Sequence, residues 1–171
     1  PSLDWDIGKL RKEIYRSKLE SHIPNAIELD SIIEDSFNFH FEKRHELTFY
    51  DGALEALEYL STKYHLGVLT NGNADINKLE IDKYFKFSIS SKDVKSNKPS
   101  SGHFDEALRL SNLQPNEVLH IGDHQVNDMR GALNAGFNVL WFNKNDDGWA
   151  QDFPEPASLS DWYNHKIIEN I

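Results

Sequence analysis

Two aspartates five residues apart could bind a divalent cation. Asp123 follows the apolar run 118–122, which is typical of a buried parallel strand, and Asp128 lies in the first turn of the predicted next helix. Open α/β folds bind ligands at the carboxyl edge of the sheet. Mg²⁺ prefers hard oxygen ligands of this kind. The alternative is that Asp123 only caps the helix, as aspartate often does.

A second polar motif, Thr70-Asn71-Gly72, follows the apolar run 66–69. Thr70 offers a hydroxyl, and Asn71 and Gly72 offer backbone N–H groups in a turn that glycine makes flexible. Such a loop before a helix can hold an anion, because free N–H groups and the helix dipole both favour negative charge. An ordinary strand-to-helix turn explains the same residues, since Asn-Gly is a common turn pair.

A third motif, Lys98-Pro99, precedes a helix that we expect to begin near Ser100 or Ser101. Proline suits a helix start, where its missing N–H is not needed, and Phe104 and Ala107 continue at helical spacing. A cation fixed there can face a phosphate or keep an aspartate ionised. A lone surface lysine is more often simply solvated.

In combination and in this order, the three motifs resemble motifs two, three and four of the haloacid dehalogenase (HAD) superfamily. The resemblance covers about residues 50–142. It implies a HAD-like, Rossmannoid α/β fold, with a three-layer core around a parallel sheet and a mainly helical cap that helps select the substrate.

The resemblance also implies a chemistry. Most members are Mg²⁺-dependent phosphatases that work through an aspartyl-phosphate intermediate. Thr70 and the Asn71-Gly72 turn would bind the phosphoryl oxygens, and Lys98 would neutralise charge at the nucleophile and the phosphate. Asp123 would bind Mg²⁺, while Asp128 would support the metal shell or the lysine. A carboxylate nucleophile splits phosphoryl transfer into two easier steps, and the cations offset the developing charge.

The family's nucleophile motif, an apolar strand that ends in Asp-x-Asp, has no clear counterpart. The nearest string is Asp4-Trp5-Asp6, but only three residues precede it, too few for a buried strand. Ile7, Leu10 and Ile14 then continue as one helical stripe, so these acids fit a helix N-terminus equally well.

Without the nucleophile strand, two inner strands of the sheet would become unpaired edges. We therefore expect the chain to be an N-terminally incomplete form that is inactive alone. Its sheet would be completed by a missing N-terminal segment or by a second chain.

Composition narrows the class of partner. The net charge of −10 disfavours binding to nucleic acid or anionic membranes, but a local loop and a metal can still attract a small phosphorylated substrate. No apolar run approaches the length of a membrane span. The sequence has no cysteine, which excludes disulfides, thiolate zinc sites and cysteine nucleophiles and suits a cytoplasmic protein.

Periodicity predicts two regions, helices over residues 1–47 and an α/β core over residues 48–171. The resemblance implies that the first region is a partial helical cap. Trp149, Phe153 and Trp162 are expected to anchor the C-terminal tail to the core. The predicted elements are helices at 7–20, 26–43, 52–63 and 74–80, a strand ending at Thr70, strands at 87–90 and 118–122, and a last core strand at 138–142.

Three functions remain open from the sequence. The first is a Mg²⁺-dependent phosphatase acting on a small metabolite. The second is a 2-haloacid dehalogenase, whose chemistry needs no metal and whose family members lack the carboxylate corresponding to Asp123. The third is a catalytically inactive fragment or pseudoenzyme that only binds or assembles. The substrate itself is not encoded in the core motifs, since the cap selects it.

Overall fold

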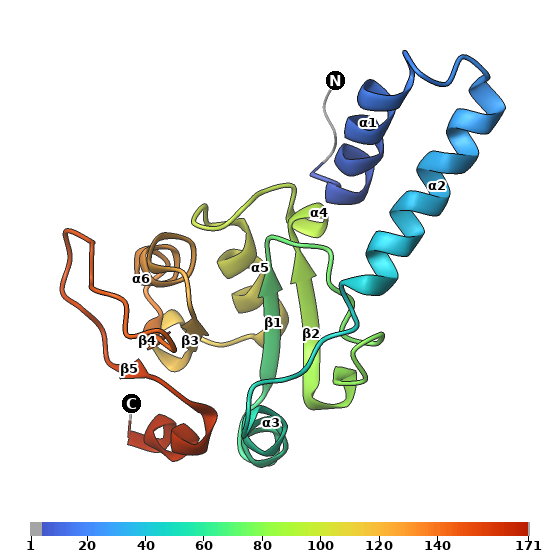
Figure 1. Ribbon diagram of the computed structural model, residues 1–171. Helices are drawn as coiled ribbons and strands as arrows, with labels where there is room; N and C mark the ends of the chain where they lie inside the picture. Colours follow the sequence, from blue (N-terminus) through green and yellow to red (C-terminus); the bar gives the residue numbers. More distant parts are fainter. Residues whose placement is uncertain (1–4, 171) are drawn as a thin grey trace.

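The computed structural model describes residues 5–170 and has the predicted α/β architecture, with parallel strands and flanking helices (Figure 1). The strands lie in two groups. In the first, β1 (Leu66–Thr70) pairs in parallel with β2 (Phe85–Ser90). In the second, β3 (Leu119–Gly122) pairs with β4 (Asn138–Phe142), which pairs with β5 (Ser158–Leu159). Within residues 5–170, no strand joins β1 to β3.

Helices cover the strands and connect them. Helix α5 packs against both β1 and β2, and α6 packs against β4 (Figure 1). These crossovers give the alternation of strand and helix that a parallel sheet requires. The α-helices of the core are α3 (Ala53–Ser61), α4 (Ser91–Val94), α5 (Gly102–Ser111) and α6 (Gly131–Asn134). Short 3₁₀ segments span Asp82–Tyr84, Pro115–Glu117 and Trp162–Asn170. A π-helical turn spans Gln125–Arg130.

The N-terminal helices form an antiparallel hairpin. Helices α1 (Ile7–Leu19) and α2 (Ala26–Lys43) confirm the predicted pair and stand beyond the carboxyl ends of β1 and β2 (Figure 1). Asp6 is the N-cap of α1, where its Oδ1 accepts from Gly8 N at 2.9 Å and Lys9 N at 3.1 Å. A capping aspartate satisfies helix N–H groups that otherwise lack partners. Asp4, the other acid of the nearest nucleophile-like string, lies outside the described residues.

One predicted helix is wrong. Residues 76–80 form turns and residues 74–75 have no regular structure; the Asp75 carboxylate accepts from both the backbone N–H and the side-chain amide of Asn77, at 2.9 Å each. An aspartate that bonds its own backbone two residues on competes with helix formation. The other predicted elements agree with the structure to within a few residues at each end, and the strand expected at 87–90 begins two residues earlier, at Phe85.

The main core cluster lies between α5, α6 and β4, where Phe104 and Trp141 are almost wholly buried. The C-terminal tail packs on it, as predicted. Trp149 lies edge-on against Trp141, with ring centroids 5.2 Å apart, and its Nε1 donates to the Phe153 carbonyl at 2.8 Å. Further along, Trp162 stacks on Phe142 at 4.8 Å. Aromatic pairs of this geometry add to the stabilisation from burial.

We predict that Trp149→Ala lowers the free energy of unfolding by about 2 kcal/mol, because it removes a partly buried ring together with its hydrogen bond. Tyr163→Ala is the matched control, since that ring is 67% exposed. Urea unfolding of both variants measures the effect. Equal stabilities for the two variants would mean that the tail is not anchored through Trp149.

Candidate active site

A buried ion pair connects the two groups of strands. Lys98 Nζ donates to the carbonyl of Leu69, near the end of β1, at 2.8 Å and to Asp128 Oδ1 at 2.5 Å. The side chains of Lys98 and Asp128 are only 9% and 7% exposed. The lysine therefore holds the end of β1 beside the turn that follows β3.

Asp128 is held by three polar contacts. Besides Lys98, its Oδ1 contacts His120 Nε2 at 3.1 Å, and its Oδ2 accepts from the backbone N–H of His124 at 3.1 Å. Burial alone raises the pKa of Asp128, but the hydrogen bond from His120 and the charge and hydrogen bond of Lys98 outweigh it and hold that pKa well below its ordinary value. The carboxylate is thus placed to support the lysine, one of the two roles expected of it.

The loop after β1 is fixed to Lys98 by side-chain hydrogen bonds. The Asn71 amide donates to the Lys98 carbonyl at 3.0 Å and accepts from the Lys98 N–H at 2.7 Å. Thr70 Oγ1 accepts from Gly72 N at 2.9 Å, which leaves its own O–H free to donate to a ligand. Thr70, Asn71, Gly72 and Lys98, predicted from separate motifs, therefore lie together.

His103 lies beneath this loop and was not predicted from the sequence. Its ring is fully buried, and Nε2 lies 3.0 Å from the Thr70 carbonyl, so Nε2 carries the proton. Burial lowers the pKa of His103, which keeps the ring neutral. The signal that could have found it is its place beside Phe104 on the apolar face of α5.

Asp123 differs from Asp128 because its side chain is exposed and has no hydrogen-bond or ion-pair partner within the described part of the chain. Its backbone carbonyl accepts from Trp141 Nε1 at 2.9 Å, which fixes the backbone that carries it. The neighbouring His124 turns away to cap the π-helical turn through Nδ1.

The side-chain oxygens of the site fit a Mg²⁺ ion that takes few of its ligands from the protein. No group of three histidine, aspartate or glutamate side chains that could hold a metal occurs among residues 5–170. Mg²⁺ commonly keeps several waters and takes one or two carboxylates together with substrate phosphate oxygens. Asp123 supplies one such free carboxylate. Asp128 is less accessible, because three contacts already hold its two oxygens.

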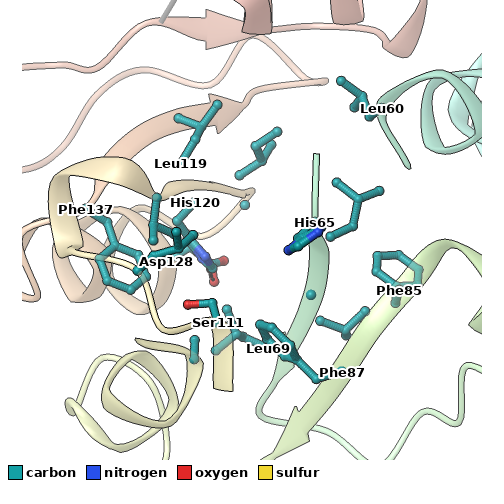
Figure 2. Close-up of a pocket in the computed structure, with 18 of the residues that line it drawn as sticks. Leu60, His65, Leu69, Phe85, Phe87, Ser111, Leu119, His120, Asp128 and Phe137 are labelled. Atoms are coloured by element: carbon teal, nitrogen blue, oxygen red, sulfur yellow. Dashed lines mark hydrogen bonds and ion pairs between the residues drawn. The ribbon is translucent and has the colours of Figure 1, made fainter. Parts of the chain in front are cut away.

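A cavity of about 470 Å³ separates β1 from β3 (Figure 2). Its walls are mainly apolar and include Leu69 from β1, Leu119 from β3, and Phe85 and Phe87 from β2. Lys98, Asp123 and Asp128 also line it, so the polar residues of the candidate site border the same space. The backbone edges of β1 and β3 that face the cavity pair with no strand in the described region.

Comparison with known proteins identifies the family. The sequence model described as "Haloacid dehalogenase-like hydrolase" matches residues 8–142, most of the chain. The chain belongs to the haloacid dehalogenase-like hydrolases. This match includes all of the α1–α2 hairpin except Ile7, and it includes Thr70, Asn71, Gly72, Lys98, Asp123 and Asp128. Within residues 5–170, no helix combines the length and apolar character needed to cross a bilayer.

Named relatives include two phosphatases. The chain is 37% identical over 84 residues to the glyceraldehyde 3-phosphate phosphatase of Pyrococcus abyssi, which covers 46% of this chain and 35% of the relative. It is 31% identical over 117 residues to the 5-amino-6-(5-phospho-D-ribitylamino)uracil phosphatase YigB of Escherichia coli. That aligned region covers 68% of this chain and 45% of the relative. The chain thus spans less than half the length of these two curated relatives.

Solved structures match almost the whole chain. A 2-haloacid dehalogenase from Pseudomonas syringae superposes with a TM-score of 0.92 at 29% identity, which covers 99% of this chain and 74% of the other. The match includes the helical hairpin and the C-terminal tail, so both belong to the fold of this relative.

Gly122 is required by the ion pair. A Cβ at this position would lie 2.4 Å from Asp128 Cγ. We predict that Gly122→Ala displaces Asp128 and lowers the free energy of unfolding by about 1–3 kcal/mol, the usual cost of overpacking. Gly148→Ala is the matched control, because a Cβ there meets nothing within 4 Å. Chemical denaturation compares them, and an unchanged Gly122→Ala variant would contradict this packing.

Asp128 also predicts a pH dependence of stability. The pKa of Asp128 in the folded state lies below its ordinary value of 3.8. The stabilisation of the folded protein by the ionised carboxylate is therefore fully present above pH 3.8 and is lost as the pH falls below it. We expect Asp128→Asn to cost about 3 kcal/mol at pH 7, as breaking a buried pair does. The difference from wild type should shrink by about 1 kcal/mol by pH 3. Urea unfolding from pH 7 to pH 3 measures it, and a constant difference would argue against an ionised Asp128 in the folded protein.

Proposed function

We propose that the protein is a Mg²⁺-dependent phosphatase that hydrolyses a small phosphorylated metabolite through an aspartyl-phosphate intermediate. The observation that carries the proposal is the exposed carboxylate of Asp123, which has no polar partner among residues 5–170 and shares a cavity with the buried amine of Lys98. The phosphatase names of the two curated relatives support it.

The residues of the chain have distinct roles in this proposal. Two of the three N–H groups of Lys98 are used by Leu69 and Asp128, which leaves one for a phosphoryl oxygen. The Thr70 hydroxyl donates to a second oxygen. Asp123 would hold Mg²⁺, which supplies charge stabilisation to the transferring phosphoryl group. His103 contacts no substrate but keeps Thr70 in place. The Asn71 side chain holds Lys98, and the backbone N–H of Asn71 would bind a phosphoryl oxygen.

We propose that the attacking carboxylate comes from a further segment, because Asp123 and Asp128, the two acids of the described region that line the cavity, have other roles. We propose that an extended segment, from elsewhere in a longer protein or from a second chain, enters between β1 and β3 and pairs with both edges. Its carboxylate would attack phosphorus and form an acyl phosphate, while the P–O bond to the alcohol breaks and the leaving oxygen takes a proton from solvent. Water would then cleave the acyl phosphate, which releases inorganic phosphate and regenerates the carboxylate.

The composition supports proposals about the binding partners and the cellular location of the protein. A net charge of −10 argues against nucleic acid or an anionic membrane as a partner. A sequence without cysteine is in keeping with a proposed cytoplasmic location.

Dehalogenation is the second candidate, since the dehalogenase from Pseudomonas syringae shares nearly the whole fold. In that reaction a carboxylate displaces halide from carbon, which needs no metal. The free carboxylate of Asp123 would then have no task. The phosphatase explains this residue, so we prefer it.

Asp123→Asn in the full-length protein should abolish Mg²⁺-dependent hydrolysis of p-nitrophenyl phosphate, because the amide neither carries the charge nor binds Mg²⁺ as tightly. Asp147→Asn, an exposed loop acid, is the matched control. Phosphate release with and without a chelator measures the effect. Unchanged turnover by Asp123→Asn, or full activity in excess chelator, would refute the metal-dependent proposal, and metal-independent halide release from 2-chloropropionate would favour the dehalogenase.

A further inference from the structure

Arg44 brings a positive charge from the helical hairpin to the loop that follows β1. It is the C-cap residue of α2, and its Nη1 donates to the side-chain oxygen of Asn73. Two neighbouring contacts fix the same junction. His45 Nε2 accepts from Asp75 N at 2.9 Å, and Lys78 pairs with Glu42, a residue of α2, at 2.7 Å. The position of Arg44 is therefore set by the structure around it.

Gly72 leaves space between Arg44 and the proposed phosphate-binding hydroxyl. A Cβ at Gly72 would lie 3.2 Å from Thr70 Oγ1 and 3.6 Å from Arg44 Nη2. Both groups thus approach one point, and the missing side chain leaves that point open. An anion at this place could contact the hydroxyl and the guanidinium together.

The acidic side chains near Arg44 are bound by other residues. Glu42 pairs with Lys78, and Glu46 pairs with Lys43 at 2.7 Å. The carboxylate of Asp75 is held by Asn77. Arg44 itself forms no ion pair with any residue between 5 and 170, and its one hydrogen-bond partner there is a neutral amide. A half-buried guanidinium with unused donors beside an anion-binding loop is suited to an anionic ligand.

We propose that Arg44 is a specificity-determining residue that binds a second anionic group, a carboxylate or phosphate, on the alcohol part of the substrate. The inference rests on the proposed phosphatase function, since Thr70 and Lys98 take the reacting phosphoryl group. The alcohol then extends from the core toward the α1–α2 hairpin, where Arg44 lies (Figure 1). Preferred substrates are small phosphate esters that carry this second negative charge.

Two esters that differ in this charge test the proposal. 3-Phosphoglycerate carries a carboxylate where glycerol 3-phosphate carries a hydroxymethyl group. In the full-length protein with Mg²⁺, wild type should bind 3-phosphoglycerate at least ten-fold more tightly, and Arg44→Met should remove this preference while leaving the affinity for glycerol 3-phosphate within about two-fold, as loss of a charged hydrogen bond implies. Arg44→Lys, which keeps the charge without the bidentate geometry, should lie between them.

The matched control is Arg16→Met, which removes one positive charge from the same hairpin at its ion pair with Asp30. It should leave both affinities unchanged. Calorimetry measures binding, and phosphate release is followed separately. If both esters bind with the expected preference but neither is hydrolysed, the phosphatase proposal fails and the role of Arg44 in binding stands. If wild type shows no preference, or Arg44→Met weakens both esters equally, the inference about Arg44 is wrong.

Discussion

The ion pair between Lys98 and Asp128 is the interaction on which the rest of the structure depends. It spans the space between the two groups of strands, because Lys98 also bonds the Leu69 carbonyl of β1 while Asp128 follows β3. Burying two charges is costly unless each finds further hydrogen bonds. Here Leu69, His120 and the backbone of His124 supply them. The pair is thus satisfied on both sides, and it fixes the amine at the edge of the cavity.

The same arrangement explains why the candidate site lies where it does. The carboxyl ends of parallel strands converge at one edge of a sheet, and the motifs after β1 and β3 meet there. Between them the cavity is apolar along its walls and charged at Lys98 and Asp123. Free strand edges facing an apolar space favour the addition of an extended segment, since its backbone would satisfy both edges at once. The segment that completes the sheet would therefore also supply the proposed nucleophile.

The loops of the candidate site could be placed from the sequence more fully than the residues that support them. Thr70, Lys98 and Asp123 each follow or precede a strongly apolar or periodic segment, so their place at one edge could be inferred. The two roles of Asp128 could not be separated from the sequence, because they depend on its contacts with Lys98 and with His120 of β3. His103 and Arg44 act through contacts 29 or more residues away in sequence, which no local pattern reveals. The expected helix at 74–80 failed because one aspartate side chain outcompeted a weak helical pattern.

The most direct test of the account is a binding measurement at residue level. Mg²⁺ and inorganic phosphate would be titrated into the isotope-labelled full-length protein while backbone amide signals are followed by NMR. The account predicts that phosphate shifts the signals of residues 70–72 and Lys98, and that Mg²⁺ shifts that of Asp123. Shifts confined to other surfaces, or none at millimolar phosphate, would contradict a phosphate site between these two strand ends.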